Sequence, residues 1–190
     1  MSQAPVTRGP RRADAQRNYE LILAAARAAV AERGGNIVLE DIARDAGVGI
    51  GTLYRHFPTR QDLLEATFLD EALELKERAE ALANVSASLD ALIAWLRLQM
   101  DFGAHGRSMG AAVMNAKHTE GSEIQLACVD MRNAGAVLLR NAQDDGYVRA
   151  DIDMVDVLRL MHGIVLASEQ ARDDQRVDGM FNLVIAGIRT

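Results

Sequence analysis

Several residue types are scarce in this sequence of 190 residues, which has one cysteine, three prolines and only 4% aromatic residues. A single cysteine, Cys128, cannot form an intramolecular disulfide, and this fits a reducing cytoplasm. No apolar run approaches the roughly 20 residues that span a bilayer, and the N-terminal residues lack the apolar core of a secretion signal. We therefore expect a cytoplasmic protein with no membrane-embedded part.

The composition favours helices. Few prolines leave long segments unbroken, and the hydrophobic residues, 49% of the chain, are dominated by Ala, Leu, Val and Met. Helical periodicity and helix start and stop signals predict nine helices, at about 12–32, 39–46, 50–57, 59–83, 88–104, 109–117, 122–141, 154–171 and 177–188. We predict an all-α fold with a disordered basic arm at residues 1–11, a small helical domain at 12–58 and a larger helical domain at 59–190.

The charge is unevenly distributed. The net charge is -6, but residues 1–60 hold nine arginines and six acidic residues, a net charge of +3, whereas the rest of the chain holds 12 basic and 21 acidic residues, a net charge of -9. A basic first domain on an acidic second domain suits a protein that contacts phosphates with one end only.

The segment from Leu39 to Phe57 has the pattern of a helix-turn-helix. Ala43 is small at the point where the two helices would cross, and Gly47 lies in the turn, where a positive φ is expected. Apolar side chains would hold the two helices at a fixed angle (Ile42, Ala46, Val48 and Leu53). The partner that this motif predicts is double-stranded DNA, with the second helix in a major groove.

The start of the second helix would face the base edges, through Gly49, Ile50, Gly51 and Thr52. The Thr52 hydroxyl can form a hydrogen bond, whereas Ile50 can contact only apolar surface such as a thymine methyl group. We expect the neighbouring polar side chains to contact phosphates: Arg44, Tyr54, His56 and Arg60.

Residues 12–65 resemble the N-terminal domain of the TetR family. The similarity lies in the stretches ILAAARAAVAERG, DIARDAGVGIGTLYRHF and RQDLLEA, in the order and spacing of that family. The resemblance implies a dimeric repressor with Ile50, Gly51 and Thr52 on bases and Tyr54, His56 and Arg60 on phosphates. Such a repressor would bind a palindromic operator and be released by a small-molecule effector.

The sequence departs from the family pattern at three positions. Val38 stands where a capping Thr or Ser is usual, and Glu40 and Asp41 could compensate through the helix dipole. Gly49 replaces the usual capping Ser, and Arg60 replaces the usual Lys with the same charge.

Other site chemistries find less support in the sequence. The glycines at 47, 49 and 51 follow a helix rather than a strand and lack a P-loop lysine, which argues against nucleotide binding. His105, His118, His162 and Cys128 form no local ligand pair, so we expect no metal site. No catalytic motif or cofactor fingerprint is present, so we expect neither an enzyme nor a bound cofactor.

The larger domain supplies candidates for an effector pocket and a dimer interface. Soft and aromatic side chains suit an adaptable pocket as well as ordinary core packing, and the candidates are Trp95, Phe102, His105, Met109, Met114, Met131, Met161 and His162. For His162 a core or interface position is favoured over a ligand contact. The last two helices would form a four-helix interface with a second copy through Leu158, Val165, Val177, Met180, Phe181, Val184, Ile185 and Ile188.

Two further hypotheses stay open on the sequence alone. The larger domain could be a helical enzyme or carrier that a DNA-binding domain targets, which would require a catalytic constellation. Alternatively, the protein could bind DNA constitutively, which a fully packed second domain would favour.

Overall fold

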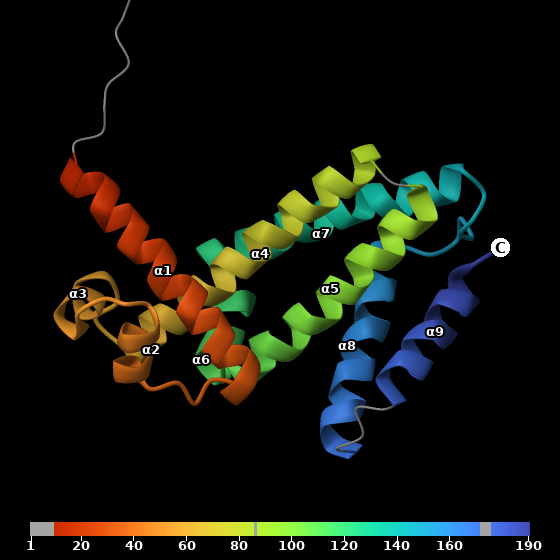
Figure 1. Cartoon of the computed structure of the whole chain (residues 1–190). Coiled ribbons are helices and arrows are strands. Elements are labelled where there is room, and N and C mark those ends of the chain that lie inside the picture. Colours follow the sequence, from red (N-terminus) through yellow and green to blue (C-terminus); the bar gives the residue numbers. More distant parts are fainter. Residues whose placement is uncertain (1–9, 86, 172–175) are drawn as a thin grey trace, which may run out of the picture. The chain divides into compact units, whose positions relative to one another are not determined.

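A computed structural model describes residues 10–85, 87–171 and 176–190. The described residues form helices joined by short turns, with one isolated β-bridge between Val148 and Arg189. The predicted all-α fold is confirmed, and Figure 1 shows the helices in chain order. Their bounds are α1 Pro10–Arg33, α2 Leu39–Asp45, α3 Ile50–His56, α4 Arg60–Val85, α5 Ser88–Ser108, α6 Ala111–His118, α7 Glu123–Asp144, α8 Met154–Ala171 and α9 Val177–Ile188.

The chain divides into two compact units, with the boundary between Thr67 and Phe68 inside α4. We predicted a boundary before residue 59, at the start of this helix. The first two turns of α4, which carry the buried residues Leu63 and Leu64, therefore belong to the first unit. Of the predicted arm, residues 1–9 lie outside the described residues, and α1 already begins at Pro10, a residue type suited to the first helical position.

The first unit packs α1 against both α2 and α3. Ile22, Ile42 and Leu53 supply one fully buried side chain from each of these helices. The start of α4 is capped: the Thr59 amide donates to Asp62 Oδ2 at 2.9 Å, and the Asp62 amide donates to Thr59 Oγ1 at 3.1 Å. This reciprocal capping fixes where the long helix begins.

In the second unit α5 is the central helix and packs against α6, α7 and α8. The indole N–H of Trp95 donates to the carbonyl of Leu75 on α4 at 2.9 Å. Phe68 of α4 stacks on Phe102 of α5 with 4.5 Å between ring centroids. Gly135 of α7 lies so close to the indole that a Cβ there would come within 2.2 Å of Trp95 Cη2. Close packing therefore fixes α4, α5 and α7 relative to one another within this unit.

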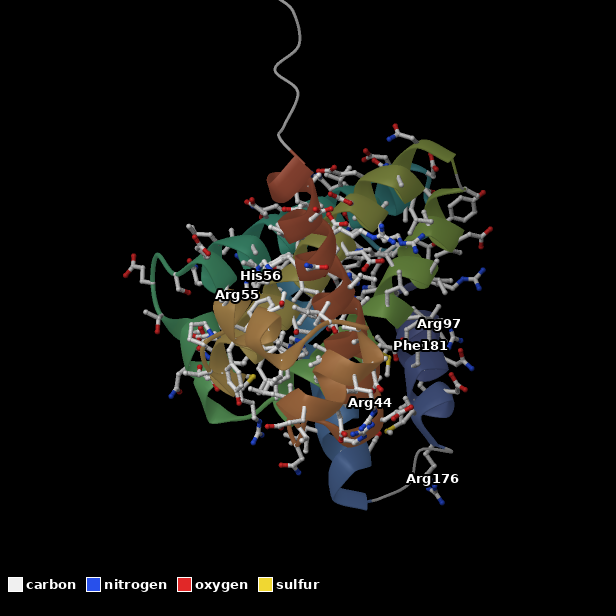
Figure 2. The ribbon with its side chains drawn as sticks, turned by 60° about the vertical axis from the view of Figure 1, so that its left-hand side comes forward. Arg44, Arg55, His56, Arg97, Arg176 and Phe181 are labelled. Carbon is white, nitrogen blue, oxygen red and sulfur yellow. The ribbon has the colours of Figure 1, made fainter. Side chains whose placement is uncertain are left out.

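The last two helices lie side by side at the C-terminal end of the chain (Figure 1). Arg97 of α5 ties α9 in place, since its guanidinium lies 4.4 Å from the centroid of the Phe181 ring and 2.8 Å from Asp178 Oδ1 (Figure 2). The orientation of α9 is thus set by contacts within the chain.

Five of the eight side chains predicted for the dimer interface are buried within the chain itself: Leu158, Val165, Phe181, Ile185 and Ile188. The other three, Val177, Met180 and Val184, are half-buried. The apolar stripe is therefore mainly the seam by which α8 and α9 pack inside the chain. Periodicity finds an apolar face, but it cannot tell whether the same chain or a second copy covers that face.

Candidate DNA-binding site

The turn between α2 and α3 has the geometry that the sequence predicts. Gly47 has a φ of +66°. Its amide donates to the carbonyl of Arg44 at 3.0 Å, and the amide of Val48 donates to the carbonyl of Ala43 at 2.9 Å. This pair of hydrogen bonds is the Schellman arrangement, which ends α2 and requires a left-handed residue at the position of Gly47. The two helices of the motif are consequently held by backbone bonds as well as by the buried side chains.

The outer surface of α3 is open. Leu53 is the buried residue of this helix, while Ile50 and Tyr54 are 39% and 44% exposed. Apart from the adjoining backbone, no atom of the described residues lies within 4 Å of where a Cβ would stand at Gly49 or Gly51. Gly49 is the N-cap and provides no side-chain hydrogen bond, as expected from the missing Ser. Glycines on an open helix face let the backbone approach another surface closely.

Thr52 and His56 of α3 are both half-buried. The imidazole of His56 packs edge-on against Tyr19 of α1, with 6.0 Å between ring centroids. A shallow surface groove beside it is lined by His56 and by residues of α1 that include Gln16 and Arg17. His56 therefore joins α3 to α1 as well as lying at the edge of the open surface.

Two of the predicted phosphate contacts have partners inside the chain. The guanidinium of Arg60 donates to the carbonyl of Gly35, in the connection that follows α1. Arg44 lies 2.8 Å from Asp41 and 3.6 Å from Asp45. Both side chains can still bind phosphate, but they would have to exchange or share these partners.

Sequence analysis missed Arg55, the exposed arginine of α3 that Figure 2 labels. Its Nε donates to the carbonyl of Gly51 at 3.0 Å, and its Nη2 donates to Thr52 Oγ1 at 3.0 Å. Three- and four-residue spacing places these residues on one face of a helix, and that spacing could have identified Arg55. The structure thus adds a cation next to the predicted base contacts.

In the second unit most of the predicted pocket residues fill the core. Trp95, Phe102, Met109, Met131 and Met161 are buried, and Met114 is half-buried. His105 lies 3.4 Å from Glu71 of α4, and its hydrogen bond to this carboxylate raises the pKa of His105. These contacts link α4 with α5.

Two polar side chains, His162 of α8 and Gln99 of α5, have a buried atom without a hydrogen-bond partner among the described residues. The contact between His162 and Gly103 forms a seam between α8 and α5. The imidazole of His162 lies against Gly103, where a Cβ would be 3.2 Å from Cδ2. Gln99, one turn earlier on α5 and only 1% exposed, was not among the predicted residues. Neither Gln99 Oε1 nor His162 Nε2 has a hydrogen-bond partner among the described residues, although both atoms are buried. Since an unsatisfied buried acceptor or donor is costly, these atoms are candidates for contact with a bound molecule.

The imidazole of His162 is neutral at pH 7. Burial, and then the positive charges of Lys117 and Arg107, lower the pKa of His162 to about 4. A neutral imidazole can both donate and accept a hydrogen bond. This seam therefore suits a polar group of a ligand better than it suits a cation.

Among the described residues, no group of three or more His, Cys, Asp and Glu side chains is placed to hold a metal ion. Across the same residues, no helix combines the length and the apolar character needed to cross a membrane.

Two family models match the chain. Residues 22–67 match bacterial regulatory proteins of the tetR family, and residues 87–190 match the C-terminal domain of SbtR-like transcriptional regulators. No curated protein matches the chain significantly.

Solved structures include two relatives that align over nearly their whole length. A TetR transcriptional regulator from Streptomyces coelicolor is 33% identical, with a TM-score of 0.77, and the match covers 90% of this chain and 98% of that one. A TetR transcription regulatory protein from Mycobacterium vanbaalenii is 29% identical, with a TM-score of 0.67, covering 95% and 100% of the two chains.

Proposed function

The chain belongs to the TetR family of transcriptional regulators, and we propose that it is a cytoplasmic repressor that binds a palindromic operator as a homodimer and is released by a small-molecule effector. The observation that carries this proposal is the open face of α3, held on a helix-turn-helix whose turn is fixed at Gly47. A rigidly held short helix with small and polar side chains outward is suited to a major groove.

The proposed dimer interface is the outer face of α8 and α9. Three leucines on these helices are exposed in the single chain: Leu160 is 53% exposed, Leu166 47% and Leu183 73%. Leu183 lies two residues from both Phe181 and Ile185, which are buried, so it lies on the opposite side of α9. A second copy that packed on this face would remove the three leucines from water and complete a four-helix interface.

The proposed effector site is the seam at Gln99 and His162. Lys117 and Arg107 place positive charge near His162, and the two buried polar atoms, Gln99 Oε1 and His162 Nε2, would form hydrogen bonds with polar groups of the effector. α4 begins in the first unit and continues into the second, where His105 holds it through Glu71. In the DNA-bound dimer the two α3 helices would be spaced to fit successive major grooves. An effector would release DNA only if it bound a conformation with a different α3 spacing more tightly than the DNA-bound conformation.

Selection of duplexes from a random pool tests the proposal. The full chain should recover a palindrome whose half-sites lie about 34–36 Å apart, one turn of duplex. Titration of the selected duplex at several salt concentrations separates specific binding from binding driven by phosphate charge. A folded, dimeric protein that enriches no motif would contradict the proposal.

A further inference from the structure

We propose that Arg55 contacts a base: its guanidinium binds the O6 and N7 acceptors of a guanine in each operator half-site. The inference rests on the proposed function, because it needs α3 to lie in a major groove. It assigns a specificity-determining role to a residue that the family pattern leaves without one.

The first support is the position of Arg55 on α3. A helix turns about 100° per residue, so Arg55 lies roughly 200° around the axis from Leu53, two residues earlier. Leu53 is fully buried, which places Arg55 on the side of α3 that faces away from the core. Gly51 and Thr52 lie next to it on this outer side, one turn earlier. An exposed arginine therefore lies on the outward side of this helix.

The second support is the way in which the helix holds the guanidinium. The Nε and Nη2 groups donate to the carbonyl of Gly51 and to the hydroxyl of Thr52, both at 3.0 Å. A guanidinium has five N–H donors, so two on Nη1 and one on Nη2 remain. A pair of donors on the two terminal nitrogens is what guanine accepts at O6 and N7. The side chain is thus oriented in advance and keeps the donors that the base requires.

The third support is charge. Both acceptors of Arg55 are neutral, and among the described residues no carboxylate lies within ion-pair distance of it, in contrast to Arg44, which lies beside Asp41 and Asp45. Arg55 therefore offers an uncompensated positive charge on the open face of α3. Guanine presents two acceptors and no donor at O6 and N7, which makes it the matching base edge.

The same arrangement determines what Thr52 can bind. Because the hydroxyl oxygen of Thr52 accepts a hydrogen bond from Arg55, its own proton is available for donation. Thr52 would then contact an acceptor on an adjacent base, and Arg55→Ala should also loosen the preference at that position.

The experiment compares the full chain with three variants. Arg55→Ala removes the guanidinium, Arg55→Lys keeps the charge but loses the planar pair of donors, and Arg33→Ala removes one positive charge from the end of α1 as a control. Each protein selects duplexes from a random pool and is then titrated against the selected operator at several salt concentrations. Thermal unfolding verifies that each variant is folded, which the exposure of Arg55 leads us to expect.

A second titration isolates the base contact. Guanine is replaced by 7-deazaguanine at one half-site position, which removes the N7 acceptor and keeps the base pair. The wild-type chain should lose about 10- to 100-fold in affinity, whereas Arg55→Ala and Arg55→Lys should be insensitive to the replacement. Both variants should select the same palindrome without the guanine preference, and Arg33→Ala should retain that preference.

Three results would overturn the inference. If Arg55→Ala weakens all duplexes equally and lowers the salt slope by about one, Arg55 contacts a phosphate. If Arg55→Lys keeps the guanine preference, the planar pair of guanidinium donors is not what binds the base. In both cases the proposed function stands. If the wild-type chain enriches no motif at all, the proposed function fails and the inference fails with it.

Discussion

Replacing Gln99 with leucine should make the protein more stable and, at the same time, impair its response to an effector. Gln99 is 1% exposed, and its Oε1 is buried without a hydrogen-bond partner among the described residues. Leaving such a group unsatisfied costs about 1–3 kcal/mol, and leucine has a similar volume without the polar atoms. Allowing for imperfect packing of the new side chain, we expect a gain of about 1–2 kcal/mol in the free energy of unfolding.

The assay is thermal or urea unfolding of the full chain beside a matched control. For a chain of this size about 1 kcal/mol shifts the midpoint by roughly 3 °C, so Gln99→Leu should melt about 3–6 °C higher. Gln143→Leu makes the same exchange at an amide that donates to the carbonyls of Arg149 and Ile152, both at 3.0 Å. It should melt lower, because it leaves both carbonyls without this donor. A Gln99→Leu protein that is less stable than the wild type would refute the proposal that the buried amide of Gln99 serves to contact a ligand.

Three further predictions concern pH, assembly and packing. Burial lowers the pKa of His162 to about 4, so only the unfolded chain gains a proton between about pH 6.5 and 4, and stability is lost as the pH falls through this window. In urea unfolding, the free energy of unfolding of His162→Gln should therefore fall by about 1–2 kcal/mol less than that of the wild type between pH 7 and 5. Equal losses in the two proteins would contradict the lowered pKa of His162. Leu183→Arg should raise the dissociation constant of the proposed dimer by at least about tenfold in sedimentation. Each chain should stay folded, because Leu183 is 73% exposed in the single chain. An unchanged dissociation constant would place the interface elsewhere. Gly135→Ala should destabilise the chain by about 1–2 kcal/mol, since the added Cβ would meet the Trp95 ring at 2.2–2.8 Å and this clash outweighs the better helix propensity of alanine. The double variant with Trp95→Phe should lose less stability than the sum of the two single variants. Losses that simply add would argue against the clash.

Features fixed by short stretches of sequence could be predicted. The positive φ at Gly47, the caps around Thr59 and the helical fold depend on residues within a few positions of one another. The helix-turn-helix follows from the same kind of information, because its turn and crossing impose local steric requirements.

Features that depend on distant parts of the chain were missed. The bond from Arg60 to Gly35 joins residues 25 positions apart, and no local pattern signals it. That Gln99 Oε1 has no hydrogen-bond partner among the described residues becomes visible only once the neighbouring helices surround it. The apolar stripe of α9 was recognised, but its assignment to a partner subunit depended on which face packs inside the chain, as the burial of Phe181 illustrates.

In the proposed complex, one dimer places two α3 helices in successive major grooves on one side of the duplex. Insertion of base pairs between the half-sites of the selected operator tests this directly. Five added base pairs turn the half-sites to opposite sides of the duplex, and we expect affinity to fall by more than about 100-fold, with partial recovery when a full turn of ten is added. Affinity that does not depend on the spacing would show that the two helices bind independently, and it would contradict the account.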